Sequence, residues 1–201
     1  MSEIYKQTWW DNNLTNNNMF NTFLGWVGDS SAESKVFFRN YLKDKDYKNI
    51  VDVGCGPATE YFGFKQDNIN IEYTGVDSSE FLFNYNKNRD IPMIHAEAHR
   101  IPVDNDSFEI SFSRHVLEHQ PSFKPVLDEL IRISSKLAVH IWFHKPEDVE
   151  IIDYDDAQKL YHNFYKKIDI EEYLKLNEKI KNFEWVDINE KENILLIHMK
   201  E

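Results

Sequence analysis

Strand-like and helix-like segments alternate between residues 49 and 143. Several short runs of β-branched residues are bounded by polar turns, and the segments between them carry apolar residues at helical spacing. Strands separated by helices pair side by side in parallel, with the helices packed on both faces of the sheet. The alternation therefore predicts an α/β fold with a doubly wound, mostly parallel sheet of about seven strands.

The patterns also predict where the individual elements lie. Strands are expected at Asn49–Val53, Ile71–Val76, Ile91–His95, Phe108–Phe112 and Leu137–Phe143. Helices are expected at Met19–Val27, Glu33–Leu42, Ser78–Asn88 and Lys124–Ile133, with the Asn-rich residues 11–21 forming a loop that leads into the first of them. The charged segment Ile151–Leu176 is expected to be mostly helical, and Phe183–Ile188 and Ile194–Met199 form a hairpin. That hairpin gives the sheet an antiparallel C-terminal edge.

A chain of 201 residues is expected to form one domain. Residues 1–47 are predicted to be an N-terminal helical cover, 48–143 the core of the domain, 144–182 a lid or helical insertion, and 183–201 the hairpin. No internal repeat and no second domain boundary is evident in the sequence.

Charge and composition narrow the partners. The net charge is −12, from 23 Lys and Arg against 35 Asp and Glu, so nucleic acid is an unlikely partner. No apolar run approaches the ~20 residues that cross a bilayer, and the first residues lack a signal-peptide pattern. The single cysteine, Cys55, fits a reducing compartment. We therefore expect a cytoplasmic protein without a membrane segment; the sequence leaves its oligomeric state open.

The most informative segment is the glycine turn after the first expected strand. Gly54 and Gly56 let a ligand approach the backbone where a Cβ would collide. The third glycine of the dinucleotide fingerprint is missing, and Asp52 would repel a pyrophosphate but can help to hold an ammonium group. Asp77, at the end of the next strand, is placed to bind two ribose hydroxyls. These residues favour a nucleoside that carries an amino acid, with a nicotinamide oxidoreductase as a less favoured alternative.

Several segments in order give the sequence a recognisable resemblance. They are Asp52-Val53-Gly54-Cys55-Gly56-Pro57, Thr74-Gly75-Val76-Asp77-Ser78-Ser79, Ala96–Val103, Asp106-Ser107-Phe108-Glu109, Val116-Leu117-Glu118-His119 and Val126–Arg132. Together they resemble the class I S-adenosylmethionine-dependent methyltransferases, most closely the type-11 group. The resemblance covers residues 48–143 and implies a Rossmann-like fold with S-adenosyl-L-methionine as cofactor. It departs from the family at Ile133–Leu137, which lacks the usual Lys-Pro-Gly-Gly, and at Ala96 and Glu97, where Gly and Asp are usual.

The resemblance also implies which residues hold the cofactor. Asp77 corresponds to the acid that binds the ribose, and Glu97 to the acid that contacts the adenine amino group. The full set implied for cofactor binding is Asp52, Gly54, Cys55, Gly56, Asp77, Ser78, Glu97, Ala98 and Ser113.

The implied reaction is in-line transfer of a sulfonium methyl group to an oxygen or nitrogen atom of a small-molecule acceptor. Such an acceptor can need a general base, for which histidine is suited. The candidates that follow the fourth and fifth strands are Arg114, His115, His119 and His144. His115 and His119 have the spacing of a metal pair, but no third ligand is evident nearby, so no metal is predicted.

Some alternatives stay open at this point. A regulatory protein that binds the cofactor without turnover would keep the same Asp52, Gly54, Gly56, Asp77 and Glu97. The aromatic residues Tyr5, Trp9 and Trp10 form either a flap over the site or part of the core. The segment Tyr154–Tyr173 forms either a lid or a surface segment.

Overall fold

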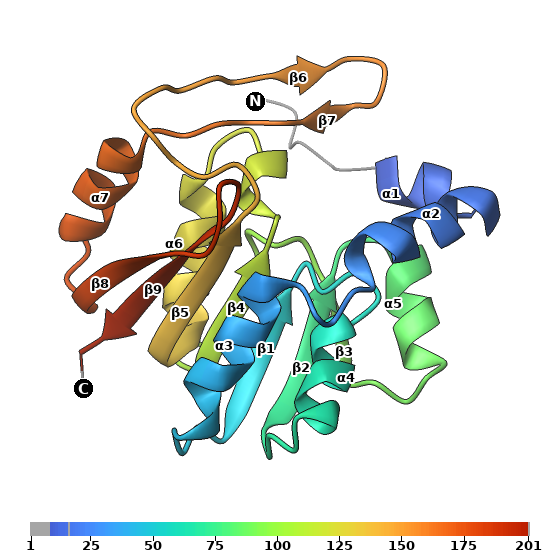
Figure 1. Ribbon diagram of the computed structural model, residues 1–201, viewed down its shortest axis with the longest axis horizontal. Coiled ribbons are helices and arrows are strands. Elements are labelled where there is room, and N and C mark those ends of the chain that lie inside the picture. The colour runs from blue at the N-terminus through green and yellow to red at the C-terminus, as the bar shows by residue number, and fades with distance from the viewer. Residues whose placement is uncertain (1–8, 16, 201) are drawn as a thin grey trace.

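The computed structural model describes residues 9–15 and 17–200 of the chain. Their main feature is a sheet of seven strands in the order β3-β2-β1-β4-β5-β9-β8 (Figure 1). The strands are β1 (Asn49–Val53), β2 (Glu72–Asp77), β3 (Met93–His95), β4 (Phe108–Arg114), β5 (Ser134–Trp142), β8 (Ile180–Asp187) and β9 (Asn193–Met199). The pairs from β3 to β5 are parallel, and β9 is antiparallel to both β5 and β8.

Helices cover both faces of this sheet. The helices are α1 (Trp9–Leu14), α2 (Asn17–Val27), α3 (Glu33–Lys43), α4 (Thr59–Gln66), α5 (Glu80–Lys87), α6 (Lys124–Ile133) and α7 (Lys167–Lys175), with a 3₁₀ turn at Leu117–His119. One core joins Phe38 of α3 and Phe64 of α4 to Ile50 of β1. The other joins α6 and α7 to the alternate strand residues, including Val51. Because successive strand residues point to opposite faces, every central strand is buried on both sides.

The predicted fold class is confirmed: a mostly parallel, Rossmann-like sheet with a C-terminal hairpin at its edge. Within the hairpin, β9 lies next to β5 and β8 forms the outer edge. β9 takes the inner position because its apolar residues 194–197 are fully buried, and a buried strand needs a hydrogen-bonded strand on each side. In the described part of the chain, no helix has the length and apolar character that a bilayer crossing requires.

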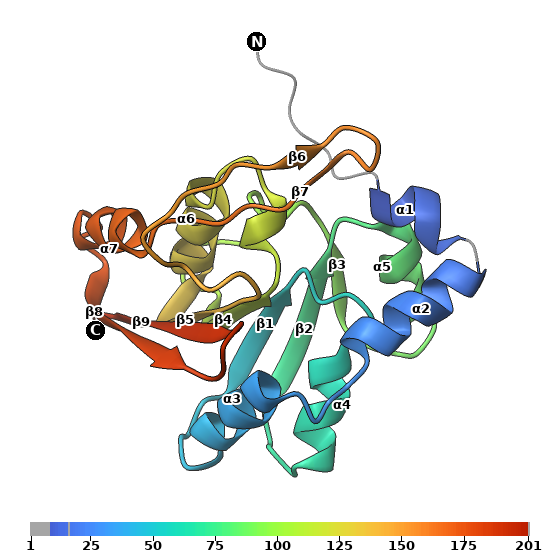
Figure 2. The same ribbon diagram turned by 45° about the horizontal axis from the view of Figure 1, so that its top comes forward.

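The prediction of a mostly helical segment at Ile151–Leu176 is wrong for its first half. Residues 154–161 form a hairpin of β6 (Tyr154–Asp155) and β7 (Leu160–Tyr161), and only α7 is helical. The Asp155 side chain accepts hydrogen bonds from the backbone N–H groups of Ala157 and Gln158, which favours a turn over a helix. The hairpin lies above the carboxyl ends of β1 and β4 (Figures 1 and 2).

The Asn-rich segment also differs from the prediction, because residues 11–14 belong to helix α1 rather than to a loop. Leu14 is buried against Phe23 of α2 and Leu82 of α5, so tertiary packing outweighs the turn preference of asparagine. Asp11 fixes the helix in place: its Oδ1 accepts from Ser79 Oγ at 2.6 Å and from the Phe81 N–H at 3.2 Å. The helix α1 is thereby attached to the start of α5.

Arg39 provides a test of the packing between α3 and α4. Its guanidinium bonds to Glu60 at 3.2 Å, Asp67 at 2.8 Å and the Ser30 carbonyl at 2.6 Å, and both Arg39 and Glu60 are 3% exposed. Arg39→Ala leaves a buried carboxylate without its main partner, so we expect urea unfolding to show a loss of about 3–5 kcal/mol. The control Lys48→Ala removes an exposed ion pair with Asp46 and should cost about 0.5 kcal/mol or less. Equal losses in the two variants would contradict this account.

Candidate active site

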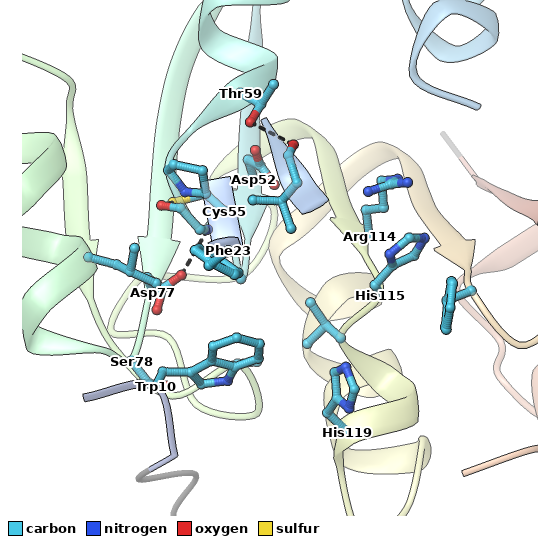
Figure 3. A pocket seen from close by; sticks show the side chains of 18 of the residues that line it. Trp10, Phe23, Asp52, Cys55, Thr59, Asp77, Ser78, Arg114, His115 and His119 are labelled. Atoms are coloured by element: carbon cyan, nitrogen blue, oxygen red, sulfur yellow. Dashed lines mark hydrogen bonds between the residues drawn. The ribbon is translucent and has the colours of Figure 1, made fainter. Parts of the chain in front are cut away.

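A cavity of about 770 Å³ lies over the carboxyl ends of β1, β2 and β4 (Figure 3). Strand order reverses between β1 and β4, because β2 and β3 lie on one side of β1 and the later strands lie on the other. Open α/β sheets bind ligands at such a switch point. The topology therefore creates the cavity where the sequence analysis places the ligand.

The glycine turn after β1 forms one wall of the cavity. Gly54 and Gly56 both have left-handed backbones, with φ of +71° and +55°. A Cβ on Gly54 would lie 2.5 Å from Val116 Cγ2, so a larger residue does not fit. The N–H groups of Gly54 and Cys55 both donate to the Val76 carbonyl, at 2.8 and 3.0 Å. The end of β1 is thus held against the end of β2.

Asp77 and Asp52 place two buried carboxyl groups on the cavity. Asp77 accepts from the backbone N–H of Gly56 at Oδ2 and of Ser79 at Oδ1, both at 2.9 Å. Asp52 accepts from the Tyr73 hydroxyl at 2.8 Å. Burial raises the pKa of Asp77 to about 6 and that of Asp52 to about 7. Neither carboxyl has a cation within ion-pair distance among the described residues, so a bound cation would compensate them.

The structure brings together most of the residues implied for cofactor binding. Those that line the cavity are Asp52, Gly54, Cys55, Gly56, Asp77, Ser78, Glu97 and Ala98. Ser113 is the exception: its side chain is fully buried, and its Oγ lies 2.7 Å from His140 Nδ1 in the core. The side chain of Ser113 therefore supports β4 and β5 rather than the cavity.

Three of the four catalytic candidates lie on the opposite wall. Arg114, His115 and His119 line the cavity across from the glycine turn (Figure 3). His144 does not line it; its ring stacks on Phe164 at a centroid distance of 4.0 Å. Phe143, just after the end of β5, lines the cavity instead, and its ring lies 4.6 Å from that of His144.

The carboxylate of Glu192 balances the positive charge of Arg114 on this wall. One of its oxygens, Oε1, lies 2.7 Å from both Arg114 Nη2 and His115 Nε2. Burial opposes the ionisation of Glu192, but the hydrogen bond from His115 and the charge of Arg114 outweigh it and lower its pKa to about 2. Burial lowers the pKa of His115 and of His119, whose Nδ1 lies 2.7 Å from the Tyr161 carbonyl. Both imidazoles are therefore neutral at pH 7, and they make separate hydrogen bonds.

Sequence reasoning missed several polar groups on the cavity, among them Glu192 and Lys35. Lys35 is 4% exposed, donates to the Val27 carbonyl at 2.7 Å, and has its pKa lowered to about 8 by burial. A signal for Lys35 is present in the sequence, since it falls on the same helical stripe as Phe38 and Leu42. No comparable signal marks Glu192, which comes from the turn between β8 and β9.

The N-terminal cover contributes Trp10 to the cavity. The centroid of the Trp10 ring lies 5.2 Å from that of Phe23 in α2 and 6.2 Å from that of His119. Trp10 therefore packs against a helix of the N-terminal cover and also faces the cavity. The side chain of Trp9 and the whole of Tyr5 lie outside the described residues. Leu160 of β7 and the neighbouring His162, from the segment for which a lid is one of the two predictions, also line the cavity.

Part of the sequence that forms this cavity matches a known protein family. Residues 51–139 match the family model described as a methyltransferase domain, of the type-11 group. The match covers 89 of the 201 residues and supports a class I S-adenosylmethionine-dependent methyltransferase of this group. The matched residues run from β1 into β5, and so include the glycine turn, Asp77 and the wall of Arg114 and His115.

Solved structures share the fold at low sequence identity. A phosphoethanolamine N-methyltransferase 2 from Haemonchus contortus, in complex with S-adenosyl-L-methionine, is 12% identical with a TM-score of 0.73, covering 99% of this chain and 61% of that one. A 1,6-didemethyltoxoflavin-N1-methyltransferase from Burkholderia thailandensis is 12% identical with a TM-score of 0.67, covering 100% and 93%. A SAM-dependent methyltransferase from Aquifex aeolicus is 15% identical with a TM-score of 0.63, covering 89% and 98%. Among curated protein sequences, none matches this chain.

The residues of the cavity fit S-adenosylmethionine. The cofactor carries a sulfonium and an ammonium group, which suit a wall with the buried carboxyl groups of Asp52 and Asp77. Its ribose hydroxyls can donate to the remaining lone pairs of Asp77. Gly54 and Gly56 provide a backbone that a ligand can approach closely.

Asp77→Asn tests the ribose contact. The amide keeps the size of the side chain but removes the charge, so cofactor binding should weaken by about 1.5–3 kcal/mol, the scale of a hydrogen bond to a charged group. Calorimetry with S-adenosylmethionine measures the change, and a thermal melt checks that the variant is folded. Asp104→Asn, at an exposed position away from the cavity, is the control and should bind normally. Unchanged affinity in Asp77→Asn would remove Asp77 from the cofactor site.

Asp52→Asn tests whether the site costs stability in a pH-dependent way. The folded-state pKa of Asp52 is raised from 3.8 to about 7, so its contribution to stability is fully present below pH 3.8 and is lost as the pH rises through about 7. The variant should therefore match the wild type near pH 4 and exceed it at pH 8, by up to a few kcal/mol. Urea unfolding of the ligand-free protein at the two pH values measures this. A difference that does not change with pH would contradict the raised pKa.

Proposed function

We propose that the enzyme methylates an oxygen or nitrogen atom of a small-molecule acceptor that binds between the glycine turn and the wall of Arg114, His115 and His119. The observation that carries this proposal is that both sets of residues line one cavity. Its volume of about 770 Å³ falls within the usual range for small-molecule sites. The cofactor supplies an activated methyl group when bound, so the main task of the protein is to align the two reactants.

Coverage of the cavity supports a small acceptor. Trp10 of α1 and Leu160 of β7, which are far apart in the sequence, both line the cavity. The elements α1 and β7 both lie near the carboxyl ends of the sheet strands (Figure 2). The net charge of −12 and the pairing of Arg114 with Glu192 disfavour a polyanion such as nucleic acid. Among the structures of similar fold, the Haemonchus and Burkholderia enzymes are both named for small acceptors.

The neutral imidazoles suit the acceptor side of the site. A neutral imidazole has one N–H group, which bonds to Glu192 in His115 and to the Tyr161 carbonyl in His119. The other nitrogen of such a ring is basic and can take a proton from an acceptor. Arg114 acts through its ion pair with Glu192 rather than as a free cation. We assign His144 to support of the lid, since it stacks on Phe164. The buried single thiol of Cys55 is consistent with a cytoplasmic enzyme.

Formation of S-adenosylhomocysteine tests the proposal. A panel of phenols, amines and nitrogen heterocycles is offered with S-adenosylmethionine, next to RNA and protein substrates. We expect turnover with a small acceptor and a loss of about 10²–10⁴ in kcat for His115→Ala, with cofactor affinity unchanged. His198→Ala, on β9 outside the cavity, is the matched control and should keep full activity. Tight cofactor binding without turnover on any compound would instead favour the regulatory alternative.

A further inference from the structure

We propose that Glu192 is a positioning residue that keeps a proton on His115 Nε2 and leaves Nδ1 to accept a proton from the methyl acceptor. This inference rests on the proposed function and narrows its substrate class. An acceptor served in this way carries a transferable proton on the atom that is methylated, as a hydroxyl group or an N–H group does.

The contact between the two side chains decides the tautomer. Glu192 Oε1 lies 2.7 Å from His115 Nε2, and an ionised carboxylate can only accept a hydrogen bond. The hydrogen must therefore be on Nε2, which makes Nδ1 the basic nitrogen of the neutral ring. Within the described residues, Nδ1 has no hydrogen-bond partner, and His115 lines the cavity. A base for the acceptor is thus available on this wall.

Glu192 is held rigidly enough to act as an orienting group. Its N–H donates to Asn189 Oδ1 at 2.9 Å, and its carbonyl accepts from the N–H groups of Ile188 and Asn189 at 3.1 and 3.3 Å. The Asn189 side chain in turn donates to Glu33 of α3 at 3.1 Å. Arg114 Nη2 bonds to the same carboxylate oxygen as His115. The turn and Arg114 therefore fix the carboxylate from two sides.

The backbone and the packing of His115 also fix the position of its imidazole. His115 has a φ of +57°, a left-handed conformation that a residue with a side chain rarely adopts. Its N–H still donates to the Ile141 carbonyl at 3.0 Å, so the turn is anchored to β5. The Phe143 ring packs against the imidazole at a centroid distance of 5.1 Å. Strained residues of this kind cluster at functional sites, where the surrounding structure holds them in place.

The proton-transfer step is balanced without any further reactant. The bond between the acceptor atom and its hydrogen breaks, the electron pair stays on the acceptor atom, and the proton bonds to Nδ1. His115 becomes an imidazolium with both nitrogens protonated, and the charge of Glu192 stabilises it. The proton later leaves to solvent and restores the neutral ring.

The charged groups around His115 come from several elements. Glu192 of the β8–β9 turn and Glu118 of the 3₁₀ turn favour the imidazolium, whereas Arg114 of β4 opposes it. Burial is the largest influence and lowers the pKa of His115, so the ring is neutral and able to accept a proton at pH 7.

Nitrogen NMR of the protein labelled at histidine tests the positioning role without cofactor or acceptor. In the wild type we expect one His115 tautomer, with hydrogen on Nε2. In Glu192→Gln, whose amide can donate as well as accept, we expect a mixture and a lower His115 pKa. Glu184→Gln is the matched control, since Glu184 faces His198 Nε2 at 3.2 Å and should leave the His115 signals unchanged. Hydrogen on Nδ1 in the wild type, or identical spectra in Glu192→Gln, would overturn the proposal.

Activity on the acceptors found in the panel gives the second readout. Glu192→Gln should lower kcat at least tenfold, but by no more than the roughly 10²–10⁴ that loss of the general base itself costs, with KM changed less than twofold. The acid limb of the kcat profile should move to lower pH with the His115 pKa. A merely structural Glu192 would lower the melting temperature without moving that limb, and this result would overturn the base assignment. If no acceptor is methylated, the proposed function fails, whereas the spectra still decide whether Glu192 positions His115.

Discussion

The hydrogen bond from the Gly56 N–H to the Asp77 carboxylate joins the ends of β1 and β2, and the cavity depends on it. Asp77 cannot turn away without releasing Gly56 and Ser79 together, so the carboxylate is fixed at the carboxyl edge of the sheet. The left-handed turn at Gly54 brings the chain against Val116, at the start of the opposite wall. One short segment therefore sets the distance between the cofactor side and the acceptor side.

Burial of charged side chains around the cavity reduces the stability of the fold. Asp52 and Asp77 are buried next to one cavity with raised pKa values, and Lys35 is buried with a lowered one. In each case the largest cause is the loss of solvation, which disfavours the charged form. A core made only of apolar residues would avoid this cost, but it would offer nothing to a ligand with positive groups. The charge arrangement is understandable as preparation for binding rather than as a source of stability.

The sequence predicts the cofactor side of the site better than the acceptor side, and the reason is physical. Asp52, Gly54 and Gly56 belong to one turn, and Asp77 ends the strand that pairs with β1, so local patterns place them together. Glu192 reaches His115 from 77 positions along the chain, and only because β9 inserts beside β5. Strand order of that kind does not follow from periodicity. The helix predicted for the first half of Ile151–Leu176 is wrong for a different reason, because the hydrogen bonds that Asp155 accepts favour a turn over a helix.

This division between local and distant contributions also bears on how acceptor specificity arises. Most residues that line the cavity come from one continuous stretch, residues 51–139, whereas Trp10, Leu160 and Glu192 reach it from α1, β7 and the turn between β8 and β9. Changes in these outer segments can alter the acceptor pocket without disturbing the bond between Gly56 and Asp77. Glu192 differs from the other two because it bonds directly to His115. Under the role that we propose for Glu192, a substitution there changes which nitrogen of His115 carries the hydrogen as well as the shape of the pocket, whereas substitutions at Trp10 or Leu160 change its shape.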